Sequence, residues 1–152
     1  MSPERQKGEP VLVLDAEQAW NRLEGARVGR LVLVVGSRAD IFPVNYAVAP
    51  DRTLIFRTAP GKKLAELTVN DEVLFEADQI STDEGWSVIV RGHAHWLQGA
   101  AEIEQAESLG LQPWVSTLKD YYVQIRPTEI SGRHFTFGPH PERELGEGSE
   151  GG

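Results

Sequence analysis

Short runs of apolar residues separated by polar turns dominate the chain, and this pattern predicts a mainly β protein. The predicted strands, rich in β-branched residues, cover residues 28–35, 41–49, 53–58, 73–78, 86–97, 121–126 and 129–137. Apolar residues at helical spacing predict three short helices, over about residues 16–24, 62–69 and 103–109. These helices are too short for parallel crossovers. We therefore expect a small antiparallel β-barrel rather than a doubly wound sheet.

Local signals add detail to several of these elements. Asp15 followed by Gln18 predicts a capped helix start, and Gly25 predicts the end of that helix. Gly92 interrupts the longest predicted strand and indicates a bulge or bend of the kind that closed sheets need. Pro127 predicts a break between the last two strands.

The two ends of the chain lack this apolar patterning. Residues 1–10 are polar, and residues 138–152 are rich in Gly and Glu without apolar periodicity. Segments of such composition bury too little apolar surface to fold by themselves. We expect a flexible N-terminus, one domain over residues 11–137 and a disordered, acidic, Gly-rich tail.

The charge balance and the residue types narrow the possible functions. With 15 Lys and Arg residues against 23 Asp and Glu residues, the net charge of −8 repels nucleic acids and anionic membranes, so neither is an expected partner. The chain has no Cys, which excludes disulfides, thiolate catalysis and cysteine metal sites. Neither an apolar signal segment nor a run of about 18 apolar residues is present, so we expect a cytoplasmic location.

The strongest candidate site is cationic and lies where strand 53–58 runs through a Pro-Gly turn into the second helix. Lys62 and Lys63 begin that helix, where unpaired backbone N–H groups and the helix dipole already favour an anion. Arg57 and Thr58, at the end of the strand, add a guanidinium and a hydroxyl. The residues alone support two interpretations equally, a phosphate site or a solvated helix start. The loop pattern that binds nucleotide triphosphates is absent.

A second candidate is the segment Pro43-Val44-Asn45-Tyr46. Proline interrupts the pairing of strands and so frees a stretch of backbone to contact a ligand. Amide groups exposed in this way could bind the edge of a planar ring. An ordinary edge strand with a half-buried Tyr is the equally supported alternative.

The longest predicted strand carries two more candidates. Trp86 could stack on a ring system and Ser87 could hydrogen-bond it, although a core position is the more common place for a Trp. His93 and His95 share one face of the strand, which is a geometry that two metal ligands can use. No third ligand lies nearby in the sequence, so we expect no metal site and favour a surface or interface pair.

The sequence contains no motif for nucleophilic or hydrolytic catalysis, such as Gly-x-Ser-x-Gly or His-Glu-x-x-His. Tyr46 and His93 remain as candidates for proton transfer, and we assign neither as catalytic. A site with a phosphate, a stacking surface and free strand backbone but no nucleophile indicates that a cofactor supplies the reactive atoms.

Five segments taken together resemble a known family. They are Gly29-Arg30-Leu31, Pro43 to Tyr46, Phe56-Arg57-Thr58 with Gly61-Lys62-Lys63-Leu64, Val73 to Glu76, and Gly85 to Val88 with Arg91-Gly92. Their order and spacing resemble the FMN-binding split-barrel family related to pyridoxamine 5′-phosphate oxidase, particularly its short actinobacterial-type members. The resemblance implies a six-stranded antiparallel split β-barrel with Greek-key-like connections. It also implies a homodimer with FMN bound at the subunit interface.

The resemblance further implies which segments contact the cofactor. It implies that the isoalloxazine ring is lined by the backbone of Pro43, Val44, Asn45 and Tyr46, and that its polar edge and the ribityl chain are reached by Arg57 and Thr58. It also implies that the 5′-phosphate is held by Lys62 and Lys63, and that the ring is approached from the second subunit by Trp86 and Ser87.

The function implied by this resemblance is an FMN-dependent oxidoreductase that acts on a small organic molecule. Some relatives bind a deazaflavin or haem, so a non-catalytic protein that stores or senses such a cofactor is the alternative, and a barrel without a ligand is a third. Residues 130–135 only loosely resemble the substrate motif of pyridoxamine 5′-phosphate oxidase, whose activity we therefore do not expect. The lysine junction is one residue shorter than in that enzyme, which leaves Lys62 and Lys63 as alternative phosphate ligands.

Overall fold

The computed structural model describes residues 10–111 and 121–138 of the chain. Its helices are α1 (Ala16–Glu24), α2 (Lys62–Val69) and α3 (Ala100–Glu107). Its strands are β1 (Val11–Leu14), β2 (Val28–Val35), β3 (Arg38–Val48), β4 (Leu54–Thr58), β5 (Glu72–Ile80), β6 (Glu84–Trp96) and β7 (Tyr121–Thr136). The expected mainly β fold with a few short helices is confirmed. Most of residues 1–10 and 138–152, where we expect flexible ends, lie outside the described residues.

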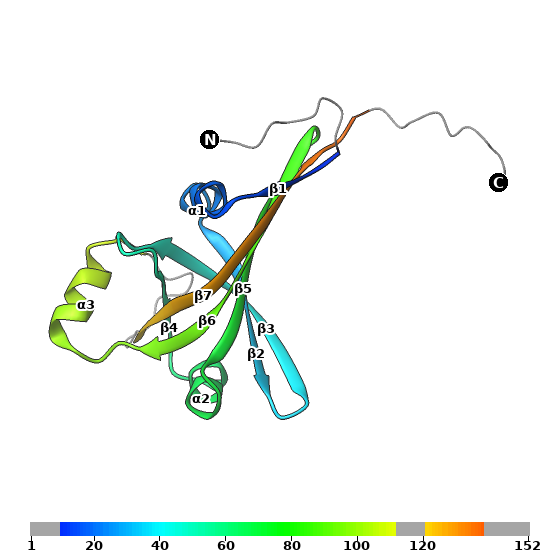
Figure 1. Ribbon diagram of the computed structural model, residues 1–152. Helices are drawn as coiled ribbons and strands as arrows, with labels where there is room; N and C mark the ends of the chain where they lie inside the picture. The colour runs from blue at the N-terminus through cyan, green and yellow to red at the C-terminus, as the bar shows by residue number, and fades with distance from the viewer. Residues whose placement is uncertain (1–9, 112–120, 139–152) are drawn as a thin grey trace.

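Six of the strands form a closed antiparallel barrel. Hydrogen bonds connect them in the order β7-β4-β3-β2-β5-β6, and the pairing of β6 with β7 closes the ring. The seventh strand, β1, pairs with the far half of β7, outside the ring. Figure 1 shows the long strands β5, β6 and β7 running from the region of α2 to a hairpin tip beside β1. Within the described residues, no helix is long and apolar enough to cross a membrane.

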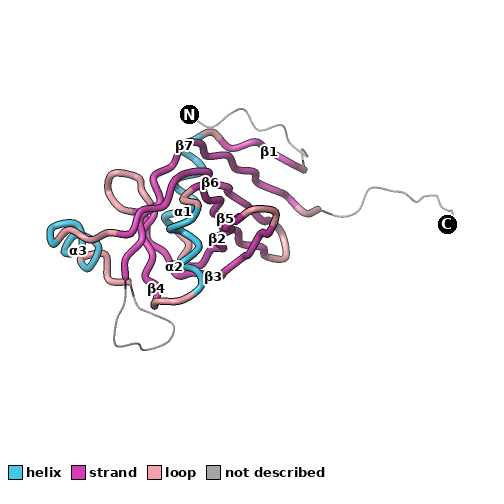
Figure 2. The backbone as a smooth tube through the Cα atoms, turned by 90° about the horizontal axis from the view of Figure 1, so that it is seen from below, coloured by secondary structure: helices cyan, strands magenta, loops and turns pink. Residues whose placement is uncertain are grey.

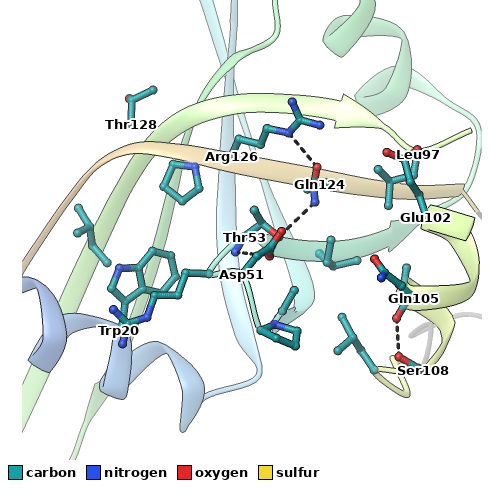
Figure 3. Close-up of a pocket in the computed structure, with 18 of the residues that line it drawn as sticks. Trp20, Asp51, Thr53, Leu97, Glu102, Gln105, Ser108, Gln124, Arg126 and Thr128 are labelled. Carbon is teal, nitrogen blue, oxygen red and sulfur yellow. Dashed lines mark hydrogen bonds between the residues drawn. The ribbon is translucent and has the colours of Figure 1, made fainter. Parts of the chain in front are cut away.

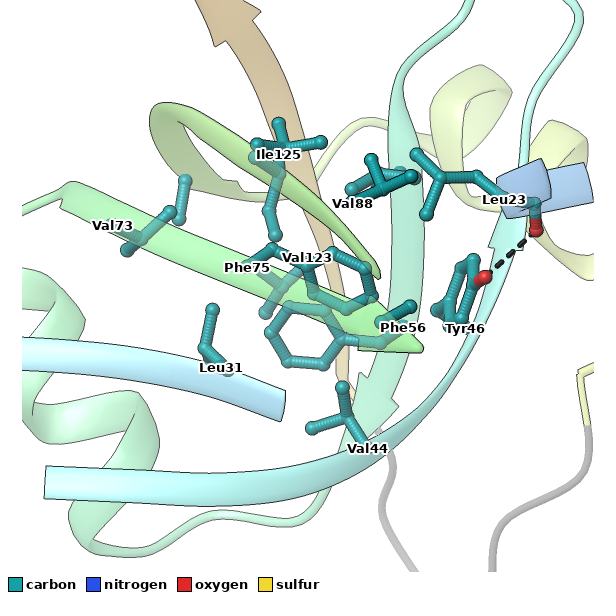
Figure 4. Packing of buried hydrophobic residues seen from close by; sticks show 14 of the residues in the cluster. Leu23, Leu31, Val44, Tyr46, Phe56, Val73, Phe75, Val88, Val123 and Ile125 are labelled. Carbon is teal, nitrogen blue, oxygen red and sulfur yellow. Dashed lines mark hydrogen bonds between the residues drawn. The ribbon is translucent and has the colours of Figure 1, made fainter. Parts of the chain in front are cut away.

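The barrel interior is a single apolar core, filled by alternate residues of each strand. Phe56 and Phe75 are its largest fully buried side chains, and Figure 4 shows them between Leu31, Val44 and Ile125. Because side chains alternate between the two faces of a strand, the neighbours of these residues point outward. The alternation in the sequence therefore sets both the core and the outer surface of the barrel.

Two short helices contribute to this core. Asp15 accepts a hydrogen bond from the backbone of Gln18 and the Gln18 side chain accepts one in return, so the expected cap of α1 is present. The apolar stripe of α1, which includes Leu23, and the apolar stripe of α2, which includes Leu64 and Leu67, are buried against the strands. Seen from below in Figure 2, α1 and α2 lie within the outline of the strands, whereas α3 lies to one side.

Helix α3 covers part of the outer face of the barrel. It packs Ala106 against Ile55 of β4, Tyr122 of β7 and Leu97, which follows β6, in a second apolar cluster. These residues belong to the outward-facing set of their strands. The barrel thus has one outer region that is covered by a helix, and this region positions the cavities described below.

The bulge expected at Gly92 is present, but its extra residue lies on the opposite strand. Arg91 pairs with Glu129 and Gly92 pairs with Pro127, so Thr128 is the unpaired residue. A Cβ atom on Gly92 would lie 2.3 Å from the carbonyl oxygen of Arg126, so the close approach of the two strands requires glycine there.

The predicted break at Pro127 is wrong, because β7 continues through it. Pro127 lies at the bulge, where its missing N–H costs no regular ladder bond. Several predicted boundaries also change. Strand β3 begins at Arg38 because the turn needs only two residues, with Gly36 at a φ of 62°, and residues 79 and 80 belong to β5. Strand β6 begins at Glu84 rather than at residue 86, and α3 covers Ala100–Glu107 rather than residues 103–109. Strand β1 was not predicted, since four residues carry too short an alternation.

Candidate functional site

The start of α2 is an open set of backbone donors with positive charge beside it. Helix α1 begins with an Asp cap, and α3 has Glu102 in its first turn. Helix α2 follows Gly61, without a side-chain cap and without an acidic residue in its first turn. The first N–H groups of a helix have no partner within the helix, so this end can accept an anion.

Lys63 is the cation best placed to serve such an anion. Its ammonium lies 5.4 Å from the ring centre of Phe42 and 5.8 Å from that of Phe56, and no carboxylate of the described residues pairs with it. Burial against these rings lowers the pKa of Lys63. Burial has removed part of the water that would stabilise this charge. A bound anion would stabilise it instead, so Lys63 is well placed to bind a negatively charged group.

Lys62, in contrast, already has carboxylate partners. Its ammonium lies 3.3 Å from Asp40 of β3 and 3.8 Å from Glu66, one turn further along α2. A hydrogen bond with Glu66 lowers the pKa of Asp40, whereas burial, together with Asp40, raises the pKa of Glu66. The two lysines that the sequence left as alternatives therefore differ in the structure, and Lys63 is the available one.

Strand alternation divides the candidate segment of β3 between two faces. Pro43 and Asn45 point away from the core, whereas Val44 and Tyr46 are buried within it. The Tyr46 hydroxyl donates a hydrogen bond of 2.7 Å to the carbonyl oxygen of Leu23, and burial raises the pKa of that hydroxyl. Tyr46 is thus a core residue whose side chain does not face a surface ligand.

Most of β3 before Tyr46 pairs with only one neighbouring strand. Residues 38–45 of β3 pair with β2, but pairing with β4 begins only at Tyr46. The second hydrogen-bonding edge of residues 39–44 is therefore not part of the sheet, as expected for a strand that contacts a ligand through its main chain.

Arg57 and Thr58 of β4 also point to opposite sides. Thr58 is buried on the side of Phe56, near the rings that Lys63 contacts. Arg57 faces outward, where it donates a hydrogen bond of 2.9 Å to the carbonyl oxygen of Leu111 and lies over the ring of Tyr122. The structure therefore groups Thr58 with Lys63 and places Arg57 on the side covered by α3.

A small cavity adjoins the outward-facing part of β3. It has a volume of about 420 Å³ and lies between the end of α1, residues 45–48 and the segment Leu109 to Leu111, which follows α3. Asn45 lines it, and so does Leu111, whose carbonyl oxygen binds Arg57. Of the expected cofactor-binding segments, only Pro43 to Tyr46 contributes to this lining, through Asn45 and Tyr46, while Arg57 is connected to it through its hydrogen bond to Leu111.

Trp86 and Ser87 lie far from the lysine junction of the same chain. Trp86 pairs with Gln79 at the β5–β6 tip, whereas His93 pairs with Glu72 at the end of β5 that follows α2. Seven residues of strand separate these positions, which is roughly 20 Å. The indole of Trp86 is 7% exposed and belongs to the core, so its ring does not stack on a surface ligand in this chain.

One member of the histidine pair of β6, His93, is paired with a carboxylate. His93 Nδ1 lies 3.1 Å from a carboxylate oxygen of Asp71, and both side chains are largely exposed. Across residues 10–111 and 121–138, no group of three His, Asp or Glu side chains is arranged to hold a metal ion.

A larger cavity, which the sequence did not reveal, lies on the other side of α3. Its volume is about 1060 Å³, and it is lined by the β3–β4 turn, the middle of β7, α3 and Trp20 of α1 (Figure 3). Polar residues alternate with apolar ones along β7 at Gln124 and Arg126, which indicates only a solvent-facing side. No sequence signal shows that α3 covers this face.

Comparison with known proteins connects this geometry to a family. The family model described as pyridoxamine 5′-phosphate oxidase matches residues 15–134, most of the described chain. The chain belongs to this family. A crystal structure from Corynebacterium glutamicum shares 41% identity with it, at a TM-score of 0.81, over 89% of this chain and all of that one.

Other relatives in the family give further context. The FAD binding protein from Mycobacterium smegmatis is 42% identical, with a TM-score of 0.73, over 84% of this chain and all of that one. The uncharacterized protein Rv3129 of Mycobacterium tuberculosis is 49% identical over 92 residues, which are 60% of this chain and 84% of that one. The family and the fold expected from the sequence are thus confirmed.

Proposed function

We propose that this chain is a flavin-dependent oxidoreductase that binds FMN at the start of α2. The observation that carries the proposal is the uncapped first turn of α2 with the half-buried, carboxylate-free ammonium of Lys63 beside it. A 5′-phosphate would accept hydrogen bonds from those backbone amides and from Lys63, while Thr58 lies on the same side. Membership of the family and the FAD-binding relative support a flavin as the ligand.

The ring of the flavin is expected on the outer side of β3. There the edge of β3 that does not pair with β4, over residues 39–44, offers donors and acceptors to a planar ring, and the small cavity lies beside it. When bound, the flavin supplies the hydride and electron chemistry. The residues of this chain hold the phosphate, orient the ring and shield one side from water.

A homodimer would complete this site, and two observations support it. Trp86 and Ser87 lie near the β5–β6 tip rather than at the end of β5 that follows α2. We therefore propose that this part of β6 approaches the flavin of a second copy, with Ser87 facing outward and Trp86 remaining in the core. The outer face of β2, β3 and β6 also carries Val28, Val34, Ile41 and Ile89, which are between 41% and 62% exposed. A surface of this kind is typical of an interface between subunits.

The second candidate function is a non-catalytic flavin carrier. It is supported by the positions of the two residues considered for proton transfer. The Tyr46 hydroxyl is buried and bonded to Leu23, and His93 is bonded to Asp71, so neither faces the proposed flavin position. A hydride exchange between flavin and substrate needs no acid or base from the protein when solvent supplies the proton. Redox tests therefore have to separate an enzyme from a carrier.

Titration with FMN tests the binding proposal. We expect Lys63→Ala to weaken FMN binding by about 1.5 to 3 kcal/mol, because a charge-assisted hydrogen bond to the phosphate is lost. Lys62→Ala is the matched control and should weaken binding less, since Asp40 and Glu66 already neutralise Lys62. Equal FMN affinities of the wild type and Lys63→Ala, measured by quenching of flavin fluorescence, would remove the proposal.

Absorption spectroscopy distinguishes FMN from the other possible cofactors, and an enzyme from a carrier. Parallel titrations with FAD, a deazaflavin and haem identify the preferred cofactor, because each has its own absorption bands. Bleaching of the bound flavin by a reduced nicotinamide nucleotide, followed by reoxidation with a small organic acceptor, would indicate an oxidoreductase. A bound flavin that neither bleaches nor reoxidises over a panel of donors and acceptors would indicate a carrier.

A further inference from the structure

The larger cavity beside α3 is separate from the residues proposed to hold the flavin. None of its lining residues belongs to the phosphate or ring segments, although it shares Leu109 with the small cavity. Its volume of about 1060 Å³ is at the upper end of the range for small-molecule sites, about 300 to 1,000 Å³. It is therefore large enough for a second ligand.

A chain of hydrogen bonds fixes the polar floor of this cavity. Arg126 Nε donates to the Gln124 side chain at 3.1 Å, Gln124 donates to the Thr53 hydroxyl at 3.2 Å, and that hydroxyl donates to Asp51 at 2.7 Å. Figure 3 shows the four side chains as one continuous line across the floor. Thr53 is only 8% exposed, so the middle of the chain is held within the protein. The floor is a preorganised polar surface.

Arg126 is the charged group that remains available at the end of this chain. Its Nε is bonded to Gln124, and its two terminal nitrogens have no partner within the described residues. The other cavity arginine, Arg52, is bound to the carboxylate of Glu17 and lies 5.9 Å from the ring centre of Trp20. A guanidinium with free terminal nitrogens binds a carboxylate in a bidentate manner.

The acidic groups around the cavity are already engaged. Asp51 accepts hydrogen bonds from the backbone and hydroxyl of Thr53, at the far end of the floor from Arg126. Glu102 accepts a bond from the backbone of Gly99 at the start of α3, and Glu129 pairs with Arg91 on the neighbouring strand. Asp51 and Glu102 keep their negative charge in these hydrogen bonds. Arg126 is the lining cation that no carboxylate of the described residues neutralises, so an anion would bind at the Arg126 end of the floor.

Apolar residues form another part of the lining, beside further polar ones on α3 and β7. The apolar residues include Ile55, Leu97, Ala106, Leu109 and Ile130. We propose that this cavity binds a small amphipathic carboxylate, with its carboxylate on Arg126 and its apolar body against α3. This inference does not rest on flavin binding, because the two sets of residues are distinct.

Calorimetric titration with a pair of probes tests the proposal. The probes are 2-naphthoate and the uncharged 2-naphthamide, which have the same shape and differ in charge. We expect 2-naphthoate to bind at least tenfold more tightly than 2-naphthamide. Arg126→Gln should abolish this preference, whereas Arg133→Gln, an exposed arginine of β7 outside the cavity, should preserve it. Equal affinities for the two probes, or an unchanged preference in Arg126→Gln, would overturn the proposal.

A second variant tests the position of the site without removing a charge. Gln105 lies on the exposed side of α3 and lines the cavity, so Gln105→Trp should fill the cavity without disturbing the core and should weaken 2-naphthoate at least tenfold. Unchanged binding would place the probe elsewhere and overturn the proposal. Repeating the titrations with and without FMN keeps the two hypotheses apart. Probe binding without flavin binding would support this cavity and contradict only the flavin proposal.

Discussion

The inner and outer faces of the same barrel strands differ in what they do. On β3 the buried Tyr46 packs edge to face on Phe75, with ring centres 4.8 Å apart, and bonds to Leu23. Its neighbour Asn45 points outward and lines the small cavity. The side chains of these adjacent residues therefore lie on the outer surface and in the core, because a strand turns successive side chains to opposite sides, although both residues line the small cavity.

The same division holds on β4 and explains how the candidate site is built. Phe56 is fully buried in the core, and its ring lies near the ammonium of Lys63. Arg57 lies on the outer side that α3 covers, where its guanidinium is near the ring of Tyr122. A ligand on one face can contact consecutive residues only through their backbone. Changes to inward-facing residues should therefore alter stability, and changes to outward-facing residues should alter binding or assembly.

The largest effect on stability is expected from a substitution of an inward-facing residue at the centre of the core. Phe75→Ala should lower the free energy of unfolding by about 3 to 5 kcal/mol, because Phe75 is fully buried and its removal leaves a cavity. Denaturant unfolding measures the loss. A loss below about 1 kcal/mol would mean that the interior is not closely packed around this ring.

A smaller effect is expected from the hydrogen bond of Tyr46. Tyr46→Phe keeps the ring and removes the donor to the Leu23 carbonyl, so the free energy of unfolding should fall by about 1 to 2 kcal/mol. FMN affinity, measured in the folded protein, should stay the same because the hydroxyl faces the core. A large loss of FMN affinity with unchanged stability would reverse the assignment of this residue.

On the outer face, Glu76 should make the stability of the protein depend on pH. Burial raises the pKa of Glu76 to about 7, with Asp78 beside it and Arg30 only partly compensating. In the unfolded chain Glu ionises at about 4.3, so between that pH and about 7 the unfolded state binds fewer protons than the folded state. Stability should therefore fall as pH rises through this range and level off above it, by about 1 kcal/mol after solvent screening.

Glu76→Gln tests this contribution because it removes the titrating group and keeps the shape of the side chain. The slope of stability between pH 4.5 and about 7 should become flatter than in the wild type, as measured by urea unfolding at several pH values. An identical slope in the variant would assign the pH dependence to other groups.

The smallest effect is expected at Pro43, which is exposed on the outer face of β3. Pro43→Ala should change the free energy of unfolding by less than about 0.5 kcal/mol, because the side chain has no core contacts. FMN affinity should change little as well, if the ring is contacted by backbone. A marked stability loss would show that this face is packed against another surface, such as a second copy of the chain.

Much of the fold was predictable because local signals agreed with it. Strand β2 and helix α1 begin and end at the expected residues, since the cap at Asp15 and the β-branched run after Arg27 are unambiguous in the sequence. The break at Pro127 was predicted wrongly because the bulge that accommodates it depends on the partner strand. A local rule about proline has no information on that partner.

The candidate site was predictable only in part. The lysine pair marked the start of α2, but the difference between Lys62 and Lys63 depends on Asp40, which comes from another strand. The polar floor of the larger cavity combines Thr53 and Gln124, which are 71 residues apart. Contacts of this kind depend on how the barrel closes.

The sequence by itself determined which segments are strands and helices, because side-chain periodicity and caps are local properties of the chain. It also determined that positive charge gathers at the start of α2 within an acidic protein. The tertiary structure decided which residue of each adjacent pair faces inward, which lysine is free of carboxylates, and where α3 leaves cavities. Alternation sets two faces on every strand, but only the closure of β6 on β7 encloses one of them as the core.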